Sequence, residues 1–94
     1  MSSKEIVEKL KKETERFQEK MDAVLKTIKV TNPKGNDLLC MANAYFKDSH
    51  HFSKKGDFIS AFEAVNISWG YLDSGLRLGF FEVPVELKRW FTVD

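Results

Sequence analysis

The sequence has few of the residues that hold small secreted or metal-binding proteins together. Of its 94 residues only Cys40 is a cysteine, so an intramolecular disulfide and a cysteine-based zinc site are both excluded. A lone thiol, which we expect to be buried, fits a reducing compartment. The hydrophobic content of 43% and the charged content of 31% are those of one globular domain.

The sequence also lacks an excess of either charge. Fifteen Lys and Arg residues balance fourteen Asp and Glu residues, for a net charge of +1, so the composition does not favour a nucleic-acid-binding protein. The longest runs without a charge, 38–46 and 64–72, have nine residues each, far fewer than the roughly 20 of a membrane span. Because residues 1–5 lead directly into a charged segment without an apolar signal-peptide core, we expect a cytoplasmic protein with no membrane contact.

Two breaks divide the chain into three long segments of helical periodicity. The first break is the proline- and glycine-containing run 31–36, and the second is Lys55-Gly56-Asp57, where Gly56 suits a helix end and Asp57 a helix start. The sequence therefore predicts an all-α protein, an antiparallel three-helix bundle with helices at about 3–29, 37–55 and 58–78.

The first and third predicted helices differ in character. Ser2 and Glu5 have capping-box spacing before the first helix, whose apolar residues form one narrow seam: Val7, Leu10, Phe17, Met21, Val24 and Ile28, with Thr14 in the gap. Because this helix is longer than the second, its seam is expected to project beyond it.

The third helix carries small residues seven positions apart at Ala61, Ser68 and Gly75. This spacing predicts a channel in which a neighbouring backbone packs closely. Ala64, Tyr71 and Leu78 add apolar surface on another flank of the same helix.

The segment 80–94 is an apolar tail. Pro84 suits the first turn of a short helix at about 84–91, in which Leu87, Trp90 and Phe91 share a face. Such a tail either folds back over the bundle or binds another chain. We expect these three residues to form an interface, because large aromatic side chains dominate interface energies.

A second candidate site lies where the second and third helices meet. Tyr45, Asp48, Trp69 and Asp73 are predicted to converge there, so that a partly buried carboxylate, a phenol and an indole N–H line a small polar pocket. The same carboxylate can instead accept hydrogen bonds that fix the helix register. His50 and His51 are adjacent and cannot both ligate one metal from one helix face.

Five segments form a recognisable set: 41–49, His51-Phe52, 55–58, Ala61-Phe62 and 69–80, the last with the pattern Trp-Gly-x-Leu-Asp-x-Gly-x-Arg-Leu-Gly. Together they resemble the short archaeal proteins of the family called "domain of unknown function 357". The resemblance covers the second and third helices. Over the first helix only the general pattern of residue types is similar, and the resemblance does not extend over 83–94. It implies a compact bundle of three helices in an archaeal cytoplasm and supplies no catalytic residues.

These observations favour a binding module over an enzyme. No catalytic, cofactor-binding or metal-binding constellation is found, so no cofactor is expected. We expect the protein to bind a protein partner or itself, as a homodimer or other homo-oligomer. The alternative is an RNA-associated protein related to the HEPN helical nucleases. The turn at Gly56-Asp57 resembles the turn between two helices in those nucleases. The chain lacks the nuclease motif, because no histidine follows Arg77.

Overall fold

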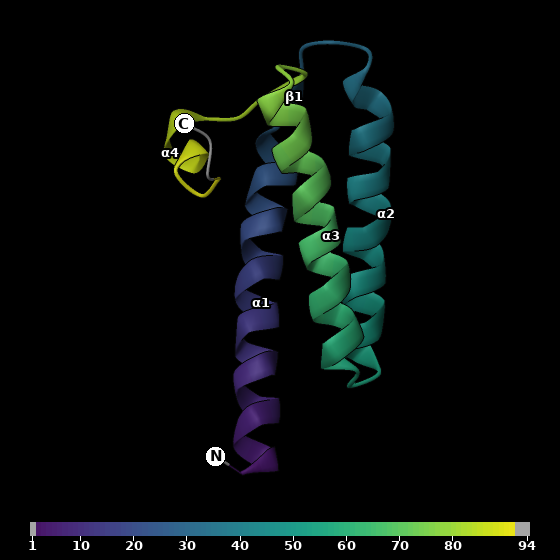
Figure 1. Ribbon diagram of the computed structural model, residues 1–94, viewed down its shortest axis with the longest axis vertical. Helices are drawn as coiled ribbons and strands as arrows, with labels where there is room; N and C mark the ends of the chain where they lie inside the picture. The colour runs from purple at the N-terminus through teal and green to yellow at the C-terminus, as the bar shows by residue number, and fades with distance from the viewer. Residues whose placement is uncertain (1, 92–94) are drawn as a thin grey trace.

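A computed structural model describes residues 2–91 and confirms the three-helix bundle (Figure 1). Helix α1 (Ser3–Thr27) runs up, α2 (Gly35–Lys54) down and α3 (Phe58–Arg77) up again. The predicted ends lie within two residues of the observed ones, which is the usual uncertainty at a frayed helix end. Within residues 2–91, no helix combines the length and the apolar character that crossing a membrane requires.

The helix starts agree with the capping predicted from the sequence. The Ser2 hydroxyl accepts a hydrogen bond from the backbone N–H of Glu5 at 3.2 Å and donates one to its carboxylate at 3.2 Å. Asp57 caps α3 by accepting from the backbone N–H of Ser60 at 3.1 Å. Just before it, Gly56 has a φ of 77°, which a side chain disfavours, so the α2–α3 turn depends on this glycine.

The small residues of α3 form the predicted channel. The Ser68 hydroxyl donates to the backbone carbonyl of Ala42 at 2.6 Å, and the Ser49 hydroxyl donates to that of Ala61 at 2.8 Å, so α2 lies directly against α3 at two levels. Gly75 serves a different neighbour, because a Cβ atom there would overlap the ring of Phe81.

A buried polar contact joins α1 to α2. The side-chain amide of Gln18, only 7% exposed, donates to the hydroxyls of Ser49 at 2.9 Å and Ser53 at 3.0 Å. Thr14 is fully buried in the seam, and its hydroxyl donates a hydrogen bond to the backbone carbonyl of Leu10 at 2.8 Å. Thr14 therefore fits the apolar seam because its own helix satisfies its polar group.

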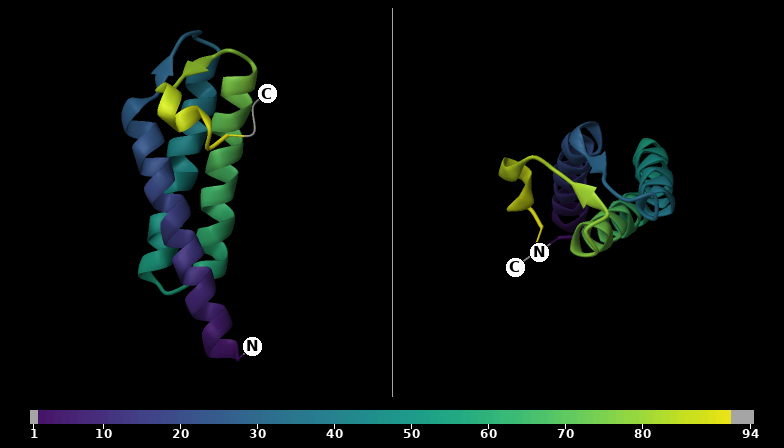
Figure 2. Two further views of the ribbon diagram at one scale, coloured as in Figure 1. Left: turned by 90° about the vertical axis from the view of Figure 1, so that its left-hand side faces the viewer. Right: turned by 90° about the horizontal axis from the view of Figure 1, so that it is seen from above.

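Helix α1 projects beyond the turn that joins α2 to α3 (Figures 1 and 2), as its length predicts. Ile6 and Val7 lie on this projecting end and are about half exposed. The molecule is accordingly elongated, at 46 × 24 × 18 Å. Cys40, expected to be buried, is exposed on α2.

A pair of short strands was not predicted. β1 (Lys29–Val30) pairs antiparallel with β2 (Phe81–Glu82), with Lys29 opposite Glu82 and Val30 opposite Phe81. Helix α1 accordingly ends two residues before the predicted position, because Lys29 leaves the helix to form this pair. Gly79, with a φ of 78°, turns the chain from α3 toward β2.

The tail folds back over its own bundle. Helix α4 (Val85–Lys88) is shorter than the predicted 84–91. After it the chain continues in single turns, in which the backbone N–H groups of Trp90 and Phe91 donate to the backbone carbonyls of Leu87 and Lys88. Figure 2 shows the tail on the side of α1 and α3 that faces away from α2. Residues 92–94, the end of the predicted tail, lie outside the described residues.

Candidate functional site

The two carboxylates of the predicted polar pocket are far apart. The contacts of Ser68 with Ala42 and of Ser49 with Ala61 set the register of α2 against α3. In this register about eleven residues of helix separate the level of Asp48 from that of Asp73, or about 16 Å at 1.5 Å per residue. Asp48 is also exposed. The predicted convergence is therefore wrong for this pair.

The two aromatic residues of that pocket point to different sides of α3. The ring of Tyr45 stacks on that of Tyr71, with centroids 5.9 Å apart and planes at 20°. Trp69 instead stacks on Phe91 of the tail at 4.2 Å and 9°, and meets the edge of Phe17 of α1 at 6.3 Å. Trp69 is part of the packing between α3, α1 and the tail, and it does not face Tyr45.

Asp73 takes the role of a helix-surface ion-pair residue. Its Oδ2 accepts from Nε of Arg77, one turn later, at 3.2 Å. Its Oδ1 is buried and has no hydrogen-bond partner among residues 2–91. Because the side chain as a whole is 26% exposed, this carboxylate remains open to water on one side and does not form an enclosed site.

The three tail residues predicted as an interface pack on the chain's own core. Phe91 is 4% exposed and belongs to the buried cluster, while Leu87 and Trp90 are half-buried against it. The interface role is thus wrong for Phe91, whose ring is covered by Trp69 within the same chain. A cavity of about 210 Å³ remains beside Phe91 and Leu76, below the roughly 300 Å³ at which ligand pockets begin.

The histidines do not gather metal ligands. His50 meets the ring of Phe46 edge-on at 4.7 Å, and His51 lies near Phe52. Across a shallow groove from His50 lie the acidic residues Glu15, Glu19 and Asp22 of α1. Among residues 2–91, no three histidine, cysteine or acidic side chains are arranged to hold a metal ion.

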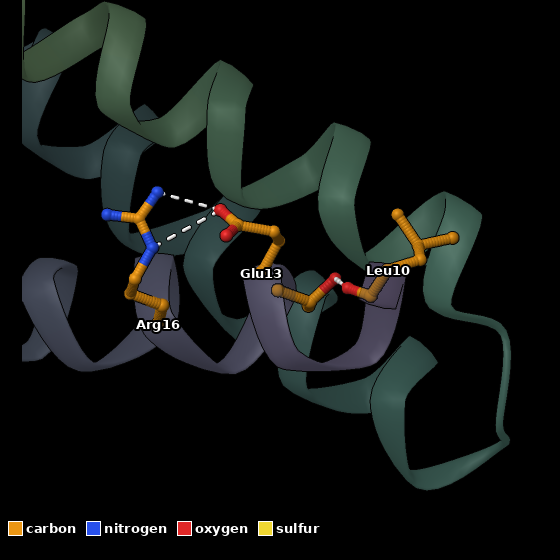
Figure 3. Close-up of polar contacts among 4 residues, drawn as sticks. Leu10, Glu13 and Arg16 are labelled. Atoms are coloured by element: carbon orange, nitrogen blue, oxygen red, sulfur yellow. Dashed lines mark hydrogen bonds and ion pairs between the residues drawn. The ribbon is translucent and has the colours of Figure 1, made fainter. Parts of the chain in front are cut away.

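Some of the basic side chains of α1 contact other side chains of the same chain. Arg16 donates to the Glu13 carboxylate at 2.7 and 3.2 Å (Figure 3), and this hydrogen bond lowers the pKa of Glu13 below its usual value. Arg16 also lies over the ring of Phe17, and Lys20 lies over Phe17 and over Trp90. Arg16 and Lys20 are therefore occupied by contacts with neighbouring side chains of the same chain.

An exposed apolar surface does exist, on the side of α2 and α3 that the tail leaves uncovered. Met41, Ile67 and Leu78 are 38%, 44% and 62% exposed, and the stacked pair Tyr45–Tyr71 is half-buried between the two helices. We call these five residues the α2–α3 face. The spacing of residues 41 and 45 places both on one side of α2. In the same way, residues 67, 71 and 78 lie on one side of α3.

The sequence contained the signal for this face but not its exposure. Ala64, Tyr71 and Leu78 were expected to add apolar surface on a separate flank of the third helix. Tyr71 and Leu78 belong to this face, whereas Ala64 is buried. Among residues 2–91, no further helix covers the flank of α2 and α3 that is turned away from α1.

The comparisons with known proteins agree with this architecture. A family model described as "Protein of unknown function (DUF357)" matches residues 5–81, which includes all three long helices. The crystal structure of protein AF1782 from Archaeoglobus fulgidus, assigned to the same family model, is 30% identical. It superposes with a TM-score of 0.75 over 84% of this chain and 99% of that chain. A comparison with curated protein sequences finds no match.

Proposed function

The chain belongs to the DUF357 family, whose description states no function, and we propose that it is a protein-binding module whose contact surface is the α2–α3 face. One observation carries the proposal: Met41, Ile67 and Leu78 expose a third to two thirds of their surface around a stacked tyrosine pair. Methionine and aromatic residues are enriched at protein interfaces, where charged residues are depleted. In this role the protein acts by binding and not by catalysis.

The position of the tail supports this choice of surface. The tail residues Phe81, Val83 and Phe91 are at most 7% exposed, so they already cover one side of the bundle from within the chain. The α2–α3 face has no such cover among residues 2–91. Contiguous apolar area left exposed on a small domain marks an interaction site more often than an ordinary surface.

The test uses two exposed positions whose substitution leaves the core intact. The full chain, tagged, is recovered from its native extract with and without nuclease, and its stoichiometric companions are identified. The double variant Ile67→Lys/Leu78→Lys should lose a nuclease-resistant companion or its self-association, because two ammonium groups would be buried without partners. Val85→Lys, at a position that is 78% exposed on α4, is the matched control and should keep it.

Two outcomes would contradict the proposal. If the double variant and the control bind equally well, the contact surface lies elsewhere. If the companions disappear with nuclease and binding weakens steeply with salt, the RNA-associated alternative is the better one, and neutralising Lys11, Lys12 and Arg16 should then abolish binding.

A further inference from the structure

The solvent-facing side of α3 contains a glycine that packing within the chain does not explain. Gly70 lies in the middle of α3 and is exposed, and a Cβ atom built there would meet nothing within 4 Å among the described residues. Glycine is one of the poorest helix formers, so this position weakens α3 without any benefit to internal packing.

The other glycine inside α3 shows the contrast. A Cβ atom at Gly75 would overlap the ring of Phe81, so Gly75 allows the tail to pack against α3. A glycine within a helix commonly marks the close approach of another backbone. At Gly70 no segment between residues 2 and 91 lies within 4 Å of the Cβ position, which leaves this side of α3 open to the backbone of another chain.

Charges at the two ends of this side identify the partner. Glu63 lies seven residues before Gly70, and Arg77 lies seven residues after it. Seven residues are about two helical turns, so all three positions share one side of α3, with the charges about 10 Å from Gly70 in opposite directions. Both side chains reach solvent, since Glu63 is exposed and Arg77 is 49% exposed.

A second copy of α3, turned antiparallel with Gly70 against Gly70, complements this pattern. A twofold axis at Gly70 places Glu63 of each copy level with Arg77 of the other, so opposite charges meet at both ends. A parallel arrangement would place like charges together. Arg77 keeps its hydrogen bond with Asp73 and gains a second carboxylate nearby.

We propose that the protein forms a symmetric homodimer in which two α3 helices cross antiparallel at Gly70, with Glu63 facing Arg77 of the other copy. Without a Cβ at the crossing, the axes approach more closely than the usual about 8–10 Å. Ile67, which flanks Gly70 and is 44% exposed, is then buried. This proposal rests on the proposed function and names its partner as a second copy of the chain.

The first experiment measures the molar mass of the full chain by light scattering and sedimentation equilibrium across about a hundredfold dilution. The wild type should convert between dimer and monomer. Gly70→Gln should weaken the dimer at least about tenfold, a loss of about 1.4 kcal/mol, because a long side chain separates the helices. Ala44→Gln, also at a small and exposed residue but on α2, is the control and should dimerise like the wild type.

The second experiment tests the antiparallel register. Glu63→Arg and Arg77→Glu are each expected to weaken their own homodimer, because the facing charges then have the same sign. A mixture of the two variants should recover dimer, since opposite charges face each other at both ends of the mixed pair. Damage to the fold of one variant could not be repaired by mixing, and circular dichroism checks each fold separately.

The outcomes separate this inference from the proposed function. A wild-type chain that stays monomeric at every concentration overturns the homodimer, and so does a dimer that Gly70→Gln leaves unchanged. Either result leaves the proposed function standing if a different protein still binds and is lost with Ile67→Lys/Leu78→Lys. A mixture that stays monomeric while the wild type dimerises overturns the antiparallel crossing.

Discussion

Replacing Phe91 with alanine tests whether the tail belongs to the core. The Phe91 ring is 4% exposed and stacks on Trp69 at a centroid distance of 4.2 Å. Burial of such a side chain contributes about 1.5–3 kcal/mol, and a well-placed aromatic pair contributes about 0.5–1.5 kcal/mol more. We therefore expect Phe91→Ala to lower the free energy of unfolding by about 3 kcal/mol, the lower end of the range for such core truncations.

This loss has an upper limit set by the tail itself. When the segment after β2 detaches and α1, α2 and α3 stay folded, a single tail substitution costs no more stability than the docking of the whole tail contributes. Deletion of residues 83–94 should consequently destabilise the protein at least as much as Phe91→Ala. Urea unfolding followed by circular dichroism measures both losses of stability. Each kcal/mol corresponds to about 4–8 °C in Tm for a chain of this size.

Val85→Ala is the control for the Phe91 substitution. Val85 lies on the same tail but is 78% exposed, so its truncation should change stability by less than about 0.5 kcal/mol. If Phe91→Ala leaves stability within that range and instead alters the oligomeric state, then the tail is an interchain surface and the packing argument is refuted.

Two further predictions concern single positions of α3 and its cap. Gly75→Ala should destabilise the protein by about 3 kcal/mol, the upper end of the range typical of overpacking, because the added Cβ overlaps the ring of Phe81. Gly70→Ala should instead raise the stability of the dilute monomer by about 1 kcal/mol. Thermal melts compare the two variants, and equal effects would contradict the packing. The hydrogen bond from Ser60 lowers the pKa of Asp57 below its ordinary 3.8, so the ionised cap stabilises the fold above about pH 4 and this contribution is lost as the pH falls further. Asp57→Ala should thus be less stable than the wild type at pH 7 and converge with it below pH 4; a constant difference across this range would show that the carboxylate charge is not involved.

The helices could be predicted because their signals are local. The spacing of apolar residues and the caps at Ser2 and Asp57 involve residues at most a few positions apart. The β1–β2 pair could not be predicted in this way, because Lys29 and Val30 meet Glu82 and Phe81 across half of the chain. A two-residue strand has almost no pattern of its own, so its partner determines it.

The candidate sites failed for a different reason. Periodicity gives the angle at which Asp48 and Asp73 leave their helices, but not their levels along the axes, which depend on how α2 is registered against α3. That register is set by two short contacts, those of Ser68 and Ser49 with backbone carbonyls. The tail posed a similar problem, since the same apolar side chains can cover their own bundle or another.

The two glycines inside α3 distinguish apolar surface that packs against the chain's own tail from apolar surface that we expect to contact another chain. Both Gly70 and Gly75 weaken the helix, so close packing against a neighbour is expected at each. The structure supplies a neighbour for Gly75 in Phe81 and none for Gly70 among residues 2–91. A position that lowers stability without internal benefit is best explained by a contact made outside the chain. We therefore expect the binding surface on α3 and its flank toward α2, and not on the tail, although the tail has the more hydrophobic sequence.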